Sequence, residues 1–241
     1  MKNLVLVGGA GGIGRSLAVR AFDEGWEVTV MDLEKSLINH PPKKGIETRN
    51  IDLKDHLSIS KAFAGFKSLS GLVNLAGFMH GLNSLENTTN KEFDEVMSVN
   101  FRGAFIVAKE ALPLLKLRGG SMVNVVSGLA SNVRPNYGVY GASKAGLINL
   151  TKTLALEAAP KVRVNAVGPS AVDTAFLRGG TGRSTENEPL TLDIENYTKI
   201  TPLARIAEPD DIVGPIMFLL GPDSKFMTGQ TLWVNGGGYM P

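Results

Sequence analysis

Three polar residues, Ser127, Tyr140 and Lys144, have types and a spacing that suit proton exchange with an alcohol or a carbonyl group. An apolar run from Met122 to Val126 ends at Ser127, and a helix-forming segment opens with Tyr140. This pattern predicts a strand, a loop and a helix. Tyr140 and Lys144 are four residues apart and would share one helix face. Because the loop is long enough to fold Ser127 back over the helix start, the three side chains could converge.

The lysine matters because a free tyrosine, with a pKa of about 10, is a poor acid or base at neutral pH. An ammonium group about 4 Å away favours the phenolate by roughly 4 kcal/mol at an effective dielectric of about 20. We therefore expect Lys144 to bring the pKa of Tyr140 near neutrality, while the Ser127 hydroxyl holds the substrate oxygen. A Tyr-x-x-x-Lys pair arises by chance in about one chain in four of this composition, so the motif needs support from the rest of the chain.

The first residues predict a unit that binds a nucleotide. An apolar run, Leu4 to Val7, leads into a glycine-rich turn from Gly8 to Gly14, and apolar residues then recur at helical spacing up to Gly25. Glycines at such a junction let backbone N–H groups and a helix N-terminus approach a phosphate. A second predicted strand, Trp26 to Met31, ends at Asp32. An acid at this place is typical of dinucleotide folds, where it binds the adenosine ribose hydroxyls.

The glycine run fits three different ligand-binding motifs. Arg15 replaces the lysine that a triphosphatase phosphate loop needs, which argues against that motif. Five glycines in seven residues also cost too much backbone entropy for a turn without a ligand. The three spacings are Gly9-x-Gly11-x-x-Gly14 of dinucleotide folds, Gly8-x-x-x-Gly12-x-Gly14 of one dehydrogenase family, and Gly9-x-x-x-x-Gly14-Arg15-Ser16 of triphosphatases.

Strand and helix patterns alternate along the rest of the chain, which predicts a parallel sheet covered by helices on both faces. Asp52 and Asn74 lie at predicted strand ends, on the edge where ligands of such sheets bind. Asn100, inside a predicted helix, is either a satisfied core amide or part of the site. Further strands are expected at 46–51, 71–76, 122–126, 162–167 and 231–234, helices at 55–66, 90–117, 140–159 and 208–220, and an irregular segment at 173–200.

Composition narrows the class of protein. The chain has 241 residues, which fits one α/β domain, and a net charge of +2 without a basic run longer than Lys43-Lys44, so we expect no nucleic-acid partner and no membrane patch. The absence of cysteine and the scattered positions of His40, His56 and His80 argue against a metal site. No signal peptide and no apolar stretch near 18 residues is present. We expect a cytoplasmic protein with a small-molecule partner.

Taken in order, these motifs resemble the short-chain dehydrogenase/reductase family over the whole chain. The resemblance implies a single-domain Rossmann fold, with a seven-stranded parallel sheet and helices on both faces. It also implies a homotetramer, joined through paired long helices and through the last helix and strand. The matching residues are Gly8-x-x-x-Gly12-Ile13-Gly14, Asp32, Asp52, Asn74-x-Ala76-Gly77, Asn100, Ser127, Tyr140-x-x-x-Lys144, Pro169 and Thr174.

The same resemblance implies roles for individual residues. Tyr140 is the proton donor or acceptor, Lys144 lowers its pKa and binds the nicotinamide ribose, Ser127 holds the substrate oxygen, and Asn100 anchors a water of the proton relay. Val7, Leu75 and Ser170 depart from the family pattern of threonine, asparagine and glycine at their positions. The implied cofactor-binding residues are Gly8, Gly11, Gly12, Ile13, Gly14, Asp32, Asp52, Leu53, Asn74, Ala76, Gly77, Tyr140, Lys144, Pro169, Val172 and Thr174.

We therefore predict an oxidoreductase that moves hydride between NAD(H) and a secondary alcohol or ketone. NAD is expected over NADP because a 2'-phosphate would face Asp32, while Gly11 and Leu33 stand where NADP-dependent members usually carry a basic residue. The alternatives are an NADP-dependent ketoreductase, for example of acyl thioesters, and a non-catalytic regulator that senses the dinucleotide. The substrate pocket is expected to be framed by His80, Asn132, Arg134, Asn136 and a lid at about 175–200.

Overall fold

Parallel strands, each separated from the next by helical or loop segments, form one sheet in the computed structural model, which describes residues 2–178, 189 and 192–240. In this described part the sheet has seven strands in the order β3-β2-β1-β4-β5-β6-β7, and every neighbouring pair is parallel. The fold is therefore the predicted Rossmann fold. The strands are β1 (Asn3–Val7), β2 (Glu27–Asp32), β3 (Glu47–Asn50), β4 (Gly71–Asn74), β5 (Ser121–Val125), β6 (Arg163–Pro169) and β7 (Thr231–Val234).

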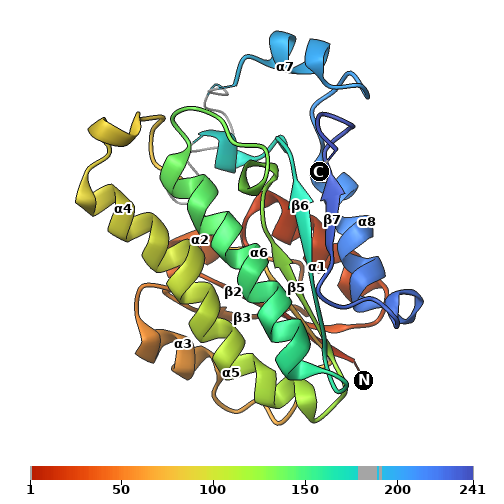
Figure 1. Ribbon diagram of the computed structural model, residues 1–241. Coiled ribbons are helices and arrows are strands. Elements are labelled where there is room, and N and C mark those ends of the chain that lie inside the picture. Colours follow the sequence, from red (N-terminus) through yellow and green to blue (C-terminus); the bar gives the residue numbers. More distant parts are fainter. Residues whose placement is uncertain (1, 179–188, 190–191, 241) are drawn as a thin grey trace.

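Helices cover both faces of this sheet (Figure 1). Apolar residues of α3, α5 and α6 form one core with the sheet, and those of α1 and α8 form a second core on the opposite face. Strand β1 serves both, because Val5 and Val7 point into the first core and Leu4 and Leu6 into the second. The helices are α1 (Gly12–Asp23), α2 (Glu34–Asn39), α3 (His56–Phe63), α4 (Asn90–Met97), α5 (Ala104–Lys116), α6 (Gly138–Ala158), α7 (Ile194–Ile200) and α8 (Pro209–Leu220).

The predicted helix at 90–117 is continuous but not uniform. It begins after Thr89, whose hydroxyl accepts from the Glu92 N–H group while the Glu92 carboxylate accepts from the Thr89 N–H group. A π-helical turn, Ser98–Gly103, then joins α4 to α5. Such turns are frequent at functional sites, and this one contains Asn100. Periodicity at three- and four-residue spacing does not reveal it, because one wide turn barely disturbs the apolar pattern.

Two short helices were not predicted. Helix α2 follows β2 directly, and α7 lies in the segment expected to be irregular, where Asp193 accepts a hydrogen bond from the Asn196 N–H group at the helix start. A 3₁₀ turn, Ala175–Arg178, also falls in that segment. The prediction of an irregular segment is therefore wrong for these residues, while positions 179–188 and 190–191 lie outside the described residues.

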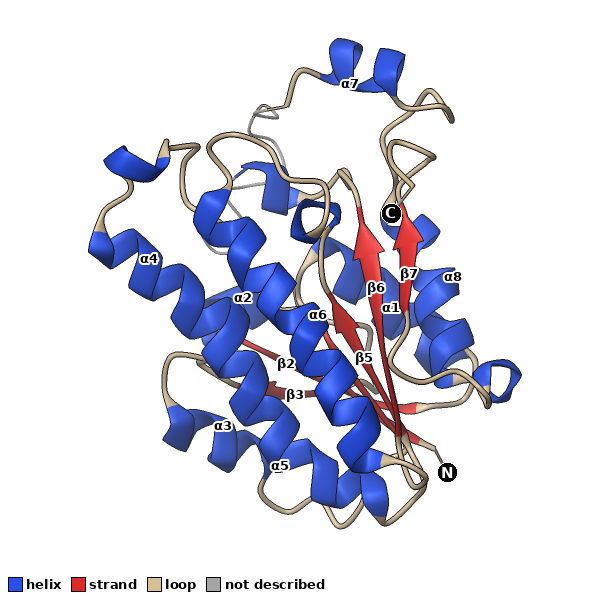
Figure 2. Ribbon diagram, viewed as in Figure 1, coloured by secondary structure: helices blue, strands red, loops and turns tan. Residues whose placement is uncertain are grey.

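The carboxyl ends of the strands meet at one edge, and α7 lies beyond that edge (Figure 2). The connection back to the sheet is tied down, because Val172 forms an isolated parallel bridge with Ala207. Ala207 precedes the start of α8, where the Asp211 carboxylate accepts from both Arg205 Nη atoms at 2.6 and 2.7 Å and from the Glu208 N–H group at 2.8 Å. The base of the segment that carries α7 is thus fixed to the N-terminus of α8.

This arrangement predicts a pH-dependent contribution to stability. The hydrogen bond from Arg205, followed by that from the Glu208 N–H group, lowers the pKa of Asp211 to about 2. A depressed folded-state pKa contributes stability above the unfolded pKa of about 3.9, and this is lost as the pH falls toward 2. We expect Asp211→Asn to lower the free energy of unfolding by about 1–2 kcal/mol at neutral pH, and by roughly half as much near pH 3. Urea titrations at the two pH values test this; a pH-independent difference would contradict it.

Candidate active site

A cavity of about 480 Å³ lies at the carboxyl edge of the sheet. Its walls combine the glycine turn after β1, the ends of β2, β4, β5 and β6, the start of α6, and residues of the segment that carries α7. Most residues that the sequence assigned to the site line it; the exceptions are Asn74, Asn100, His80 and Asn136. Residues so distant in the chain meet here because all the strands are parallel and end on the same side.

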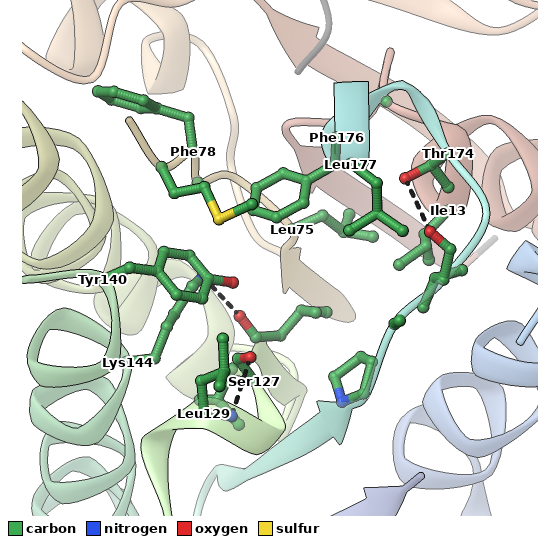
Figure 3. A pocket seen from close by; sticks show the side chains of 18 of the residues that line it. Ile13, Leu75, Phe78, Ser127, Leu129, Tyr140, Lys144, Thr174, Phe176 and Leu177 are labelled. Atoms are coloured by element: carbon green, nitrogen blue, oxygen red, sulfur yellow. Dashed lines mark hydrogen bonds between the residues drawn. The ribbon is translucent and has the colours of Figure 1, made fainter. Parts of the chain in front are cut away.

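Ser127, Tyr140 and Lys144 converge in this cavity, as predicted (Figure 3). Ser127 follows β5 and begins the 3₁₀ turn Gly128–Ala130, where its Oγ accepts from the Leu129 N–H group at 3.2 Å. Tyr140 lies in the first turn of α6, and the Ser127 side chain is close enough to affect its pKa. Phe176 faces the tyrosine ring, with a centroid distance of 5.8 Å. The two hydroxyls can therefore meet one substrate oxygen.

The Lys144 ammonium group is buried next to the Tyr140 ring. Its Nζ donates to the Val125 carbonyl at 3.0 Å and, more weakly, to the Ala76 carbonyl at 3.5 Å. It lies 6.0 Å from the centre of the Tyr140 ring. Gly77 leaves room for this approach, because a Cβ there would stand 2.9 Å from Nζ.

The predicted near-neutral pKa of Tyr140 is wrong in this structure. Burial raises the pKa of Tyr140 to about 12, and the nearby Ser127 side chain offsets only part of the rise. Burial also lowers the pKa of Lys144 to about 8. The prediction assumed an ammonium about 4 Å from the phenol and neglected desolvation, which disfavours the charged form of both groups. Tyr140 is accordingly protonated at neutral pH.

Asn100 is a fully buried amide with all its side-chain groups engaged. Its Nδ2 donates to the Phe78 carbonyl at 2.9 Å and to Ser143 Oγ at 3.1 Å, and its Oδ1 accepts from the Phe78 N–H group at 3.0 Å. It therefore ties the π-helical turn to the loop after β4 and to α6, one residue before Lys144. The Asn100 side chain therefore supports the elements that form the cavity wall and does not line the cavity itself. Its role in holding a water stays a prediction.

The glycine turn closes against the neighbouring strand ends. Gly8 has φ +79°, and a Cβ there would lie 2.7 Å from the Ala76 backbone. A Cβ at Gly12 would lie 2.5 Å from Thr174 Cγ2. Larger residues at either position would force the turn apart, so the predicted contact of the turn with a cofactor depends on both glycines.

Asp32 holds this turn in place as well as lining the cavity. One carboxylate oxygen accepts from the Ala10 N–H group at 3.0 Å and the other from the Leu33 N–H group at 2.8 Å. Arg15 Nη1 donates to the Ala10 carbonyl at 3.2 Å, so the Ala10 peptide is held from both sides. Desolvation raises the pKa of Asp32, and the two N–H donors oppose the rise. A carboxylate has about four lone-pair sites, so it can still accept a bond from a ribose hydroxyl.

Several predicted residues lie elsewhere. Asn74 is buried beside the cavity, where its Oδ1 accepts from the Ala76 N–H group at 3.3 Å, so it supports the wall; its contact with a cofactor stays a prediction. His80 and Asn136 line a separate cavity of about 30 Å³, and His80 Nε2 lies 2.9 Å from Glu95 Oε2. The assignment of His80 and Asn136 to the substrate pocket is therefore wrong. Asn132 and Arg134 do line the main cavity.

Sequence reasoning missed most of the apolar wall. These side chains come from unpatterned segments, and only the 175–200 prediction pointed to some of them.

Ser170, the departure from glycine, accepts at 2.8 Å from the Tyr197 hydroxyl of α7, which also accepts from the Ala171 N–H group at 3.3 Å. Among the residues that the structure describes, no group of three or more His, Asp or Glu side chains could hold a metal, and no helix could span a membrane. The missed lining residues include Phe78, Met79, Leu129, Tyr137 and Tyr239, whereas Phe176, Leu177, Leu192, Tyr197 and Ile200 belong to the predicted lid at 175–200.

Comparison with known proteins links this site to oxidoreductases. Residues 8–239 match the family described as enoyl-(acyl carrier protein) reductase. The chain is 32% identical over 253 residues to a 3-oxoacyl-(acyl-carrier-protein) reductase of Staphylococcus epidermidis, covering 99% of each. It is 34% identical over 247 residues to 4-formylbenzenesulfonate dehydrogenase of Comamonas testosteroni, covering 97% of this chain and 96% of the relative.

Solved structures of dehydrogenases and reductases also resemble this chain. The aldohexose dehydrogenase of Thermoplasma acidophilum superimposes with a TM-score of 0.88 at 28% identity, covering 100% of this chain and 95% of the other. The 3-ketoacyl-(acyl-carrier-protein) reductase of Brucella melitensis, solved with NADH, has a TM-score of 0.88 at 27% identity, covering 99% and 98%.

Proposed function

The chain belongs to the short-chain dehydrogenase/reductase family of oxidoreductases, and from this premise we propose that it transfers hydride between NAD(H) and a secondary alcohol or ketone. The observation that carries the proposal is the convergence of Ser127, Tyr140 and Lys144 in one cavity with the glycine turn. The turn and the strand ends would hold the dinucleotide, and the part of the cavity next to Tyr140 and Ser127 would receive the substrate.

In the direction of reduction, the protein residues manage one proton. NADH, when bound, would supply the hydride to the carbonyl carbon. The Ser127 and Tyr140 hydroxyls hold the carbonyl oxygen, and the Tyr140 hydroxyl gives its proton to that oxygen as the C–H bond forms. The products are the alcohol and NAD⁺, and Tyr140 recovers a proton from solvent. Because burial raises the pKa of Tyr140 to about 12, the group carries at neutral pH the proton that this step requires.

The preference for NAD rests on Asp32. Its carboxylate lines the cavity, and Gly11 and Leu33 leave the neighbouring positions without a basic side chain. A 2'-phosphate would face this carboxylate without a compensating cation from either position. The NADH in the Brucella melitensis relative is consistent with NAD as the cofactor here.

A second candidate is a reductase of 3-oxoacyl thioesters. The Staphylococcus epidermidis relative carries that name, and Leu129, Phe176 and Ile200 offer an apolar wall for an acyl chain. Reduction of acetoacetyl-coenzyme A by NADH and by NADPH distinguishes the two candidates. A kcat/KM far above that for plain ketones would favour the thioester, and faster reduction by NADPH would favour the NADP-dependent alternative.

The proposal as a whole is tested by a screen of ketones with NADH and of secondary alcohols with NAD⁺, followed through the absorbance of NADH. Turnover of at least one compound, abolished in Tyr140→Phe, supports it. Tight NADH binding without turnover of any compound would favour the regulator that only senses the dinucleotide.

We also propose that the protein assembles as a homotetramer. Large apolar side chains are exposed on two surfaces: Phe105 of α5 and Leu156 of α6 on one, and Phe218 of α8 with Phe226 near β7 on the other. Exposed groups of this kind mark protein interfaces. Sedimentation equilibrium should give about four times the chain mass of 25.7 kDa, and Leu156→Glu should yield a smaller species. A monomeric wild-type protein would contradict the proposal.

A further inference from the structure

Tyr239, two residues from the C-terminus, forms part of the wall of the main cavity. Its ring packs edge-on against Trp233, with a centroid distance of 5.4 Å and an interplanar angle of 69°. It also lies against Gly128, the residue after Ser127. A Cβ at Gly128 would stand 3.0 Å from Tyr239 Cε1 and 3.3 Å from the Tyr239 hydroxyl. The C-terminal tail thus reaches the loop that carries the predicted substrate-binding serine.

The Tyr239 hydroxyl is buried, and no hydrogen-bond partner for it is found among the residues that the structure describes. Asn235 is close, but its Nδ2 donates to the Tyr239 backbone carbonyl at 2.7 Å and its Oδ1 accepts from the Gly237 N–H group at 3.0 Å. Burial raises the pKa of Tyr239 to about 12, an effect that Asn235 partly offsets, so the hydroxyl is a neutral donor at neutral pH.

An unpaired buried hydroxyl destabilises a protein, because it has lost its bonds to water and gained none in return. Phenylalanine would fill the same space without that loss. The tail is also held in place, since the Leu203 N–H group donates to the Gly236 carbonyl at 3.1 Å. Gly236 and Gly237 have φ values of +61° and +83°, which allow the tail to make the turn that places Tyr239 in the cavity wall.

We propose that Tyr239 is a specificity-determining residue, whose hydroxyl binds a second oxygen function of the substrate. The proposal rests on the proposed function, because the first oxygen is the one held by Ser127 and Tyr140. From the spacing to Gly128, the Tyr239 hydroxyl lies within about 9 Å of Ser127 Cα. A second oxygen a few bonds from the reacting carbon can span that distance. The substrate class is therefore a hydroxyketone or similar bifunctional compound, not a plain ketone.

The test compares two ketones of equal size, 4-hydroxy-2-butanone and 2-pentanone, which differ by a hydroxyl in place of a methyl group. We expect the wild-type enzyme to reduce the hydroxyketone with a kcat/KM about two- to tenfold higher, as one hydrogen bond provides. In Tyr239→Phe this preference should fall to near one, with kcat/KM for 2-pentanone unchanged within about twofold. Equal preferences in the two proteins would overturn the proposal.

Thermal unfolding provides a readout that needs no turnover. Without substrate, Tyr239→Phe should be at least as stable as the wild type, because no bond is lost. The control is Tyr197→Phe, which loses two hydrogen bonds and should unfold at a lower temperature. With NAD⁺ present, 4-hydroxy-2-butanone should raise the unfolding temperature of the wild type and not that of Tyr239→Phe.

These results separate the two proposals. If the hydroxyketone stabilises only the wild type but is not reduced, the proposed ketone reduction fails and the role of Tyr239 stands. Destabilisation by Tyr239→Phe would show that the hydroxyl has a structural partner and would overturn that role. So would the absence of both turnover and stabilisation by the hydroxyketone in the wild type.

Discussion

Replacing Tyr140 by phenylalanine should lower kcat for ketone reduction by at least about a hundredfold, while the affinity for NADH stays within a factor of about two. General acid catalysis by a positioned group contributes about 10²–10⁴ to a rate, and the variant removes the proton donor. The ring remains, so its packing against Phe176 at 5.8 Å and the position of α6 should be kept. The effect should therefore appear in kcat and not in cofactor binding.

Stopped-flow measurement of a single turnover, with fluorescence titration of NADH, checks both parts of this prediction. Tyr137→Phe is the matched control, because Tyr137 lines the same cavity three residues earlier. The control should turn over within about twofold of the wild type. Retention of half the wild-type rate by Tyr140→Phe would remove Tyr140 from the role of proton donor.

The second large effect concerns the cofactor. We expect kcat/KM for NADH to exceed that for NADPH by about a hundredfold, because of Asp32. An uncompensated pair of like charges about 5 Å apart costs roughly 3 kcal/mol at an effective dielectric of about 20, which corresponds to that ratio. In Asp32→Ala the ratio should collapse toward one. Reduction of one ketone by the two cofactors, in both proteins, measures it.

Asp32 also binds the Ala10 and Leu33 N–H groups, so a second variant is needed to separate charge from support of the turn. Asp32→Asn removes the charge and keeps one side-chain acceptor. It should lower the cofactor ratio nearly as far as Asp32→Ala, with a smaller rise in KM for NADH. A wild-type ratio near one, or a preference for NADPH, would refute the assignment. If the NADH to NADPH ratio were unchanged in Asp32→Asn, the shape of the site around residue 32, and not the charge of Asp32, would discriminate between the two cofactors.

The sequence by itself determined the features that depend on local geometry. Glycines at positions 8, 12 and 14 and the strand and helix around them are specified within one short segment, because only backbone sterics and apolar periodicity are involved. The placement of Tyr140 and Lys144 on α6 follows in the same way from a spacing of four residues. Alternation of strands and helices was enough to predict a parallel sheet.

Only the tertiary structure decided which side chains complete the site and how they ionise. The His80 side chain contacts Glu95 and does not line the main cavity. Tyr239, which is far from the other site residues in the sequence, does line that cavity. Neither placement could be predicted from neighbouring residues in the sequence, because each depends on side chains that the order of the strands brings together. The pKa of Tyr140 is the clearest case. The four-residue spacing in the sequence places Lys144 near Tyr140. Burial, which only the packed molecule determines, sets the direction in which the pKa of Tyr140 shifts.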